Sequence, residues 1–333
     1  MEVAAGLVPV TEATDVAEAR RRASDAGRAI GMDAVTLGRL AIVASELATN
    51  QLKHAGGGEF FFGPAGTSAS PGVQLLAMDR GPGIPDMAAS LVDGFSTAGT
   101  SGTGLGAVRR NADTFGIDTS VKGTVVAAAV FATRPVAPLP AAGVCVPMRG
   151  ERVSGDAWAA WSAGDLTSIF VVDGLGHGAE AARAATAAID TFLRHAERSA
   201  ADVIGLVHAA LRTTRGAAVA LAELDQRSAT LRYCAVGNIA AVVSRLDGSE
   251  QHLVTLPGIA GHVSRRVQTF TYTWPRGSIL VMHSDGVGTH WSPAQYAGSL
   301  HQDPAALAGA IYRDHRRGTD DATVVVARHG QRA

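Results

Sequence analysis

The sequence predicts two consecutive units of the α/β class, in the broad sense that includes α+β folds. The chain has 333 residues, of which 47% are hydrophobic and 18% are charged, a composition typical of globular domains. Helix-like and strand-like patterns alternate on both sides of residues 134–140, which read RPVAPLP and contain three prolines. We therefore expect a first unit at residues 1–134, a linker at 135–140 and a second unit at 141–333.

The charge and cysteine content indicate which kinds of partner and which cellular compartment to expect for this protein. The formal net charge of −1 argues against a broad basic surface for nucleic acid. Cys145 and Cys234 lie far apart in apolar runs, so neither a disulfide framework nor a thiolate metal site is expected. No apolar run reaches the roughly 18–20 residues that span a bilayer. The sequence thus predicts a cytoplasmic protein that binds neither nucleic acid nor membranes.

The first half begins with two helical patterns. Thr14 and Asp15 are suited to cap a helix that runs to about Ile30, and a second helix is predicted over residues 33–55. The remaining elements are strand-like runs at 59–63, 73–79, 117–121 and 124–132, with a helix from about residue 105. This order favours helices packed over one mixed sheet.

The second half is richer in strands. The candidate strands are residues 157–162, 168–172, 217–223, 230–236, 240–244, 268–273, 279–283 and 323–327, and the candidate helices are 179–195, 201–212 and 304–314. Many strands with few helices suggest sheets that pack on each other with helices outside.

A polar face on the second helix carries three side chains at helical spacing. Glu46, Asn50 and His54 are each four residues apart, so they lie on one side of the helix. A carboxylate and an amide oxygen one turn apart are suited to hold Mg²⁺ and to orient a nucleophile. Taken alone, this face more simply indicates an ordinary solvated helix surface.

Two glycine-containing segments follow this helix. Residues 79–86 read DRGPGIPD, and an aspartate at the end of an apolar strand is placed to accept a hydrogen bond from an adenine amino group, although alone it indicates a turn. Residues 99–110 read GTSGTGLGAVRR, in which glycines lead into a helix whose free N–H groups can meet phosphates. The segment is neither a P-loop nor a dinucleotide fingerprint, because Gly-Lys-[Ser/Thr] and the third glycine are absent.

In combination these segments resemble the GHKL ATP-binding fold of anti-sigma and switch kinases. The matching order is E-L-x-x-N-x-x-K-H, D-x-G-P-G-I-P-D and G-T-G-L-G-x-V-R-R within residues 5–133. The RsbT-like serine kinase branch is most similar, including D-G-F-S-T-A-G at residues 93–99. The resemblance implies a GHKL (Bergerat) α/β sandwich that binds ATP and Mg²⁺ and phosphorylates a serine or threonine of a STAS-domain protein.

The same resemblance implies roles for individual residues. Glu46 would be the base that activates a serine hydroxyl, Asn50 would be a ligand of Mg²⁺, and Asp79 would contact adenine. The full set of implied nucleotide-binding residues is Asn50, Lys53, Asp79, Gly81, Gly83, Gly102, Gly104, Leu105, Gly106 and Thr124.

Four acidic positions at strand ends mark the second half: Asp156, Asp173, Asp285 and Asp320. Each one alone is most simply a turn residue. Brought together, carboxylates repel one another unless cations neutralise them, and ligand sets made only of oxygen select Mg²⁺ or Mn²⁺. Two such ions about 3.5–4 Å apart can bridge a water molecule, lower its pKa and direct it at phosphorus.

This set resembles the metal-dependent PPM protein phosphatases, in the bacterial branch of SpoIIE, RsbU and RsbX. The matching pieces are S-G-D, V-V-D-G-L-G-H-G, Y-C-A-V-G-N, L-P-G-I-A-G, S-D-G and T-D-D-A-T-V over residues 141–330. The resemblance implies a PPM-type α-β-β-α sandwich with two Mn²⁺ or Mg²⁺ ions. Asp173 would bridge both ions as the catalytic ligand, Gly174 would contribute its carbonyl, and Asp156, Asp285 and Asp320 would complete the ligand set.

Other polar residues near these motifs have less defined roles. Asp321 is expected to support the ligands rather than to bind metal. His177 is either a general acid or only part of its loop. Arg149 or Arg152 would contact the substrate phosphate, since a planar guanidinium binds phosphate well.

Together the two resemblances predict a bifunctional regulator that phosphorylates and dephosphorylates STAS-domain proteins of the anti-sigma-antagonist type. In the alternative interpretation, the first unit only binds ATP and sequesters a sigma factor or a phosphatase activator. Glu46 favours the kinase, because binding alone needs no base. A third interpretation is an inactive phosphatase, against which the presence of all four carboxylates argues. Because both activities at once would only hydrolyse ATP, we expect the linker or a partner to bias one of them.

Overall fold

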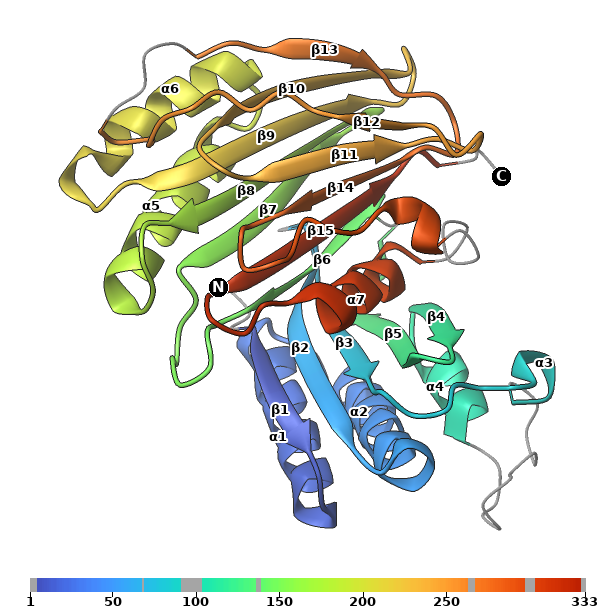
Figure 1. Cartoon of the computed structure of the whole chain (residues 1–333). Helices are drawn as coiled ribbons and strands as arrows, with labels where there is room; N and C mark the ends of the chain where they lie inside the picture. The colour runs from blue at the N-terminus through green and yellow to red at the C-terminus, as the bar shows by residue number, and fades with distance from the viewer. Residues whose placement is uncertain are drawn as a thin grey trace. The chain divides into compact units, whose positions relative to one another are not determined.

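A computed structural model describes residues 5–67, 69–90, 104–135, 139–262, 267–296 and 303–330 of the chain. The chain divides into two compact units (Figure 1). The N-terminal unit comprises Met1–Leu139 together with Ala305–Arg313, and the C-terminal unit comprises Pro140–Pro304 together with Asp314–Ala333.

The N-terminal unit contains one five-stranded sheet in the order β1-β2-β3-β5-β4. Its elements are β1 (Gly6–Val10), α1 (Ala13–Ala29), α2 (Ala34–Ala55), β2 (Gly58–Thr67), β3 (Ser70–Met78), α3 (Met87–Ser90), α4 (Gly104–Asn111), β4 (Thr114–Ser120) and β5 (Gly123–Phe131). All four strand pairs are antiparallel, so the prediction of a mixed sheet was wrong.

The two long helices begin where short-range hydrogen bonds satisfy their first N–H groups. Glu12 caps α1 through a capping box with Asp15, so the predicted cap at Thr14 and Asp15 lies slightly too far along the chain. Asp33 caps α2 by accepting from the Thr36 N–H at 2.7 Å, at the residue where the sequence predicts this helix to begin. Gly56 ends α2 in the left-handed conformation.

One face of this sheet packs against α1 and α2, which lie side by side (Figure 1). The apolar stripe of α2, formed by Leu40, Val43 and Leu47, is fully buried. It belongs to one apolar core with the sheet residues Val8, Val10, Phe60, Phe62, Val73, Leu75, Val126 and Val130. This core fixes the polar side of α2 relative to the ends of β3 and β5.

The second face of the sheet is also apolar and buried, as Leu76 and Val125 show. Helix α7 (Pro304–His315) contributes Ala305–Arg313 to this unit, although it lies far along the chain. A Cβ added at Gly309 would lie 2.8 Å from Val125 Cγ1 and 3.5 Å from both Leu76 Cδ1 and Met78 Sδ. Glycine therefore allows the helix backbone to approach this face closely.

The C-terminal unit contains two five-stranded sheets, ordered β13-β10-β9-β8-β7 and β12-β11-β14-β15-β6, and all of their pairs are antiparallel. The strands are β6 (Ala141–Val146), β7 (Asp156–Ala163), β8 (Leu166–Gly174), β9 (Ala217–Asp225), β10 (Thr230–Val236), β11 (Ala240–Ser244), β12 (Glu250–His252), β13 (Phe270–Thr273), β14 (Ile279–His283) and β15 (Ala322–Arg328). The helical elements are α5 (Ala179–His195), α6 (Ala200–Ala210) and two 3₁₀ turns at Leu211–Thr213 and Pro293–Tyr296.

Apolar layers hold these elements together. Residues of both sheets form one core, which includes Ile169, Val171, Ala220, Tyr233, Leu280, Met282 and Val325. A second core lies between the first sheet and the helices α5 and α6, and it includes Phe170, Val172, Phe192, Ile204, Val207 and Leu221. The alternation along β8 thus sends Ile169 and Val171 to one layer and Phe170 and Val172 to the other.

The strand pairing places the acidic positions near one another. Asp156 begins β7 and pairs directly with Asp173 at the end of β8. Asp285 follows β14, and Asp320 precedes β15, the neighbouring strand. Within the described ranges, the structure has no helix with the length and apolar character needed to span a bilayer.

Candidate nucleotide and metal sites

Asp79 is held rigidly at the end of β3 in the N-terminal unit. Its Oδ1 accepts hydrogen bonds from the Gly81 N–H at 2.9 Å and the Thr124 N–H at 3.0 Å. Its own N–H donates to the Thr124 carbonyl at 2.9 Å. Among the described residues no donor bonds Oδ2, so this oxygen is placed to accept from a ligand amino group.

The residues around Asp79 form a tight turn that only small residues permit. Gly83 has a φ of +81°, and a Cβ there would lie 2.4 Å from the Ser120 carbonyl oxygen. Thr119 Oγ1 accepts from the Ile84 N–H at 2.8 Å and lies 3.0 Å from Thr124 Oγ1. The predicted residues Asp79, Gly81, Gly83 and Thr124 are therefore brought together.

Asn50 faces the beginning of helix α4. A Cβ added at Gly104, the first residue of α4, would lie 3.0 Å from Asn50 Oδ1, so the amide can approach the free N–H groups there. Glu46 is half-buried one turn earlier on α2, and Lys53 is exposed. Leu105 and Gly106 lie in the first turn of α4. Gly102 lies outside the described residues.

A residue that the sequence analysis missed links α2 to this site. Gln51 is 2% exposed, and its side-chain NH₂ donates to the carbonyls of Glu59 at 2.9 Å and Met78 at 3.0 Å. These bonds tie α2 to β2 and to the residue before Asp79. Gln51 directly follows Asn50 in the E-L-x-x-N-x-x-K-H motif, and this position was the only sequence feature that pointed to it.

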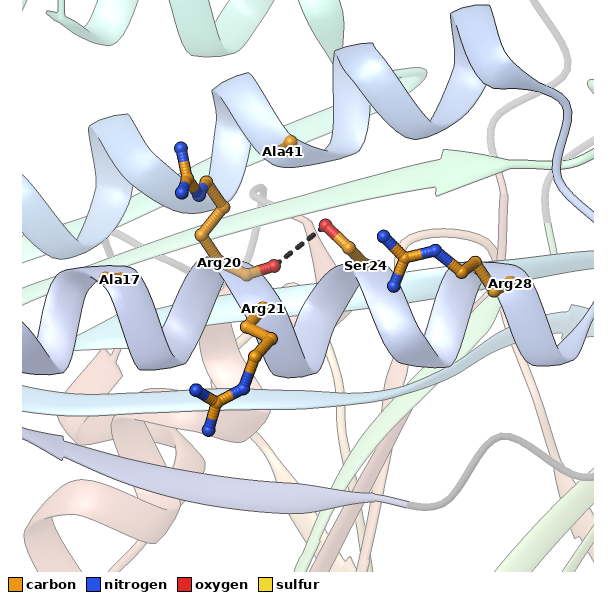
Figure 2. A pocket seen from close by; sticks show the side chains of 6 residues that line it. All are labelled: Ala17, Arg20, Arg21, Ser24, Arg28 and Ala41. Atoms are coloured by element: carbon orange, nitrogen blue, oxygen red, sulfur yellow. Dashed lines mark hydrogen bonds between the residues drawn. The ribbon is translucent and has the colours of Figure 1, made fainter.

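A separate cavity of about 450 Å³ opens on α1 and α2 of the N-terminal unit (Figure 2). Its lining comprises Ala17, Arg20, Arg21, Ser24, Arg28 and Ala41, none of which is a predicted nucleotide-binding residue. Figure 2 shows Ser24 bonded to the Arg20 carbonyl, at 2.8 Å. Arg21 and Arg28 form ion pairs with Glu18 and Asp25 on the same helix, so most of the charge here is balanced.

In the C-terminal unit, two of the four acidic side chains accept hydrogen bonds from other side chains, and Asp320 Oδ1 accepts from the Asp321 N–H at 2.9 Å. Asp156 is buried, and its Oδ2 accepts from Ser284 Oγ at 2.6 Å. Asp285 is exposed, and its Oδ2 accepts from Asn238 Nδ2 at 2.7 Å. Neither Ser284 nor Asn238 was predicted as a functional residue, although Asn238 ends the Y-C-A-V-G-N motif. Both side chains orient a carboxylate toward the cluster.

Asp321 anchors a loop beside the cluster through both of its carboxylate oxygens. Its supporting role toward metal ligands stays a prediction. Its Oδ1 accepts from the Met148 N–H and its Oδ2 from the Gly155 N–H, both at 2.7 Å. Both oxygens are thus bonded to the ends of the segment 148–155. In the middle of this segment Glu151 forms an ion pair with His177 Nδ1 at 2.8 Å.

The carboxylates influence one another strongly. Burial raises the pKa of Asp173 to about 7, with further contributions from the charges of Asp285, Asp320 and Asp321. Burial, followed by the charge of Asp173, raises the pKa of Asp156 well above its usual value. Aspartates that oppose each other's ionisation form a site where divalent cations are favourable partners.

The donor set fits Mg²⁺ or Mn²⁺, because it consists of carboxylate and carbonyl oxygens. In the parts of the chain that the structure describes, no three His, Cys, Asp or Glu side chains are arranged to hold one ion by themselves. A bound ion would therefore need additional ligands, and the Gly174 carbonyl and water molecules are of the right kind. Cys145 and Cys234 are free cysteines, and Cys145 Sγ donates to the carbonyl oxygen of Asp156 at 3.3 Å.

Comparison with known proteins identifies both units. Residues 163–330 match the family "Stage II sporulation protein E (SpoIIE)", and residues 9–130 match the histidine kinase-like ATPase domain. The chain is 35% identical over 104 residues to the serine/threonine-protein kinase RsbT of Bacillus subtilis (strain 168), which covers 31% of this chain and 78% of RsbT.

Two further matches concern the phosphatase. The phosphoserine phosphatase RsbX of Bacillus subtilis (strain 168) is 24% identical over 138 residues, 41% of this chain and 69% of RsbX. A crystal structure of RsbX in complex with magnesium superimposes with a TM-score of 0.51 at 19% identity, covering 56% of this chain and 92% of that one. At this identity the superposition supports the fold.

The fold and the carboxylate cluster define a PPM-type phosphatase unit, and the first unit is a GHKL-type ATPase domain. The chain belongs to the SpoIIE family and carries an RsbT-like histidine kinase-like ATPase domain in front of it. Both resemblances drawn from the motifs are thereby confirmed.

Proposed function

We propose that this chain is a bifunctional partner-switching regulator. The C-terminal unit removes phosphate from serine or threonine of a STAS-domain protein, and the N-terminal unit transfers phosphate from ATP to the same kind of protein. The phosphatase assignment rests on the directly paired aspartates Asp156 and Asp173 of β7 and β8, whose pKa values are raised by burial and by neighbouring carboxylates. The likeness to RsbT and RsbX supports the pairing of the two activities.

In the phosphatase site, the chain's own residues hold and orient the ligands of two Mg²⁺ or Mn²⁺ ions. Asp173 and the Gly174 carbonyl lie at the centre, and Asp156, Asp285 and Asp320 surround them. Bound ions of this type lower the pKa of water and polarise the phosphoryl group. Ser284 fixes Asp156 and Asn238 fixes Asp285, so that the carboxylates need not reorganise when an ion binds.

In the kinase site, Asp79 Oδ2 accepts a hydrogen bond from the adenine amino group while two backbone N–H groups hold Oδ1. Asn50 binds Mg²⁺ near the start of α4, whose N–H groups contact the phosphates. Glu46 accepts the proton of the attacking serine hydroxyl. Positioning and charge neutralisation supply most of the catalysis in a reaction of this class.

The decisive experiment uses the Asp285→Asn protein, in which dephosphorylation cannot erase the signal. This variant is mixed with γ-labelled ATP, Mg²⁺ and a STAS-domain protein, and label on that protein is followed. We expect label to appear, and we expect the unmutated protein with Mn²⁺ to remove it. Absence of label despite ATP binding would contradict the kinase assignment.

The second candidate function is an ATP-binding module fused to a phosphatase that is the only enzyme. It would act by sequestering a sigma factor or an activator. Glu46 argues against it, because its half-buried carboxylate lies one turn from Asn50 on the ligand side of α2. A Glu46→Ala protein that binds ATP normally but transfers no phosphate would support the kinase, whereas unchanged transfer would remove Glu46 from the mechanism.

A further inference from the structure

Arg215 lies against the loop that carries the central metal ligands of the C-terminal unit. This loop, residues 173–178, leaves β8 at Asp173 and enters α5. Gly176 has a φ of +83°, and a Cβ built on it would lie 3.2 Å from Arg215 Nη1. The guanidinium therefore rests on the bare backbone of Gly176, three residues after Asp173.

The backbone that carries Arg215 is rigid. The Leu175 N–H donates to the Gly216 carbonyl at 3.0 Å, which fixes the Arg215 segment to the metal-ligand loop. The Gly216 N–H donates to Thr214 Oγ1 at 3.0 Å, and His262 Nε2 lies 3.1 Å from the Thr214 carbonyl oxygen. Arg215 thus projects from a fixed turn and needs little ordering to contact a ligand.

The charge of Arg215 is uncompensated within the described part of the chain. No carboxylate there forms an ion pair with it, whereas Arg183, Arg232 and His177 each have an acidic partner. Its side chain is exposed. An exposed guanidinium beside a divalent-metal site is suited to a phosphoryl dianion, which it can contact through two parallel hydrogen bonds.

We propose that Arg215 is a substrate-binding residue that receives the phosphoryl group of the phosphorylated protein over Gly176. This inference rests on the proposed phosphatase function and adds a residue from outside every motif that the sequence analysis used. Arg215 acts in binding, so its loss raises KM while the hydrolytic step continues at the metal site. The requirement for Gly176 follows as well, because a side chain there would displace the guanidinium.

The test compares Arg215→Ala with Arg212→Ala, a matched exposed arginine in the preceding 3₁₀ turn. Hydrolysis of p-nitrophenyl phosphate is measured with Mn²⁺, and stabilisation by inorganic phosphate is measured as the rise in Tm of the Mn²⁺-loaded protein. For Arg215→Ala we expect KM to rise about tenfold, kcat to stay within about threefold, and the phosphate-induced rise in Tm to disappear. Arg212→Ala should match the unmutated protein in all three.

Equal KM values and equal phosphate stabilisation in the two variants would overturn the proposal. If Arg215→Ala lowers the Tm even without phosphate, the variants Arg215→Lys and Arg215→Gln separate a role in phosphate binding from a purely structural role. The proposal requires that lysine restores phosphate stabilisation and glutamine does not, and equal behaviour of these two variants would also overturn it. Failure of the phosphatase function itself would appear separately, as absence of Mn²⁺-dependent hydrolysis by the unmutated protein, and the phosphate-binding measurement would still test Arg215.

Discussion

Asp173 is the side chain whose protonation should govern the response of the metal-free protein to pH. Its pKa in the folded protein is about 7, whereas an unfolded chain releases this proton near pH 3.9. Between these values the folded state holds a proton that the unfolded state has lost, so stability falls as pH rises through this window. We expect the Tm in EDTA to fall between about pH 5 and pH 8, and to fall less in Asp173→Asn.

Divalent ions should reverse this dependence, because they compete with the proton for the same carboxylates. Addition of Mn²⁺ should therefore raise the Tm more at about pH 8 than at about pH 5. Parallel Tm profiles of the unmutated protein and Asp173→Asn in EDTA would contradict the raised pKa.

Asp321 should contribute to stability through the two backbone groups that it satisfies. Asp321→Ala leaves the N–H groups of Met148 and Gly155 without their acceptor in a mostly buried place. We expect a loss of about 2 kcal/mol or more in the free energy of unfolding of the C-terminal unit, measured by urea denaturation. Asp225 is the matched control, because its Oδ1 also accepts from two backbone N–H groups, those of Arg227 and Ser228, but in an exposed turn. Equal losses in Asp321→Ala and Asp225→Ala would contradict the argument.

At the level of single residues, the sequence predicted which side chains lie together only inside contiguous motifs. Asp79, Gly81 and Gly83 were predicted as a group because the turn that joins them is local. Ser284 bonds to Asp156, 128 positions away, and such long-range pairing leaves no local pattern. Arg215 is likewise one of many arginines, and only its position on Gly176 distinguishes it.

At the level of elements, the segment 149–153 and the loop 173–178 form neighbouring parts of the phosphatase surface. The Gly174 N–H donates to the Gly155 carbonyl at 2.9 Å, and Glu151 pairs with His177. Val153 and Leu175 are 45% and 37% exposed, and they lie in these two neighbouring segments. We predict that Val153 and Leu175 form a docking surface that contacts a protein substrate around its phosphorylated residue.

Val153→Ser should therefore discriminate between substrates. For a phosphorylated STAS-domain protein we expect kcat/KM to fall about fivefold, because about 1 kcal/mol of apolar burial is lost on binding. Hydrolysis of p-nitrophenyl phosphate should stay within about twofold. Val254→Ser is the matched control, since Val254 is 46% exposed and lies after β12. An equal effect of Val153→Ser on both substrates would place this residue outside the docking surface.

Most elements were predictable from local pattern, and the strands that were missed share a physical reason. Strands β1, β6 and β12 were not predicted, and each is a short strand at the edge of its sheet. An edge strand forms hydrogen bonds with only one neighbouring strand. Whether its residues form a strand therefore depends on that neighbour as much as on their own sequence. The direction of pairing in the N-terminal sheet was missed for a similar reason, because local periodicity does not specify partners.

At the level of the whole molecule, the second face of the N-terminal sheet depends on residues 305–313. Leu76, Met78 and Val125 are at most 2% exposed, and Gly309 of α7 lies against all three. The proposed linker at residues 135–140 separates the two units along the chain. The residues before it do not include the segment 305–313, which also belongs to the N-terminal unit. A fragment that ends at residue 139 would expose a contiguous apolar surface.

We therefore expect a fragment of residues 1–139 to self-associate and to unfold at a lower Tm than the N-terminal unit does in the full chain. Size-exclusion chromatography over a range of concentrations and thermal unfolding measure these two properties. The Leu76→Glu substitution is the control, because it should have opposite effects in the fragment and in the full chain. In the fragment it places a charge on the exposed face and should restore a monomer. In the full chain it buries an unpaired charge beneath α7 and should destabilise the N-terminal unit. A fragment that is monomeric and as stable as the full chain would mean that α7 is dispensable for this unit, and the boundary near residue 135 would then be complete by itself.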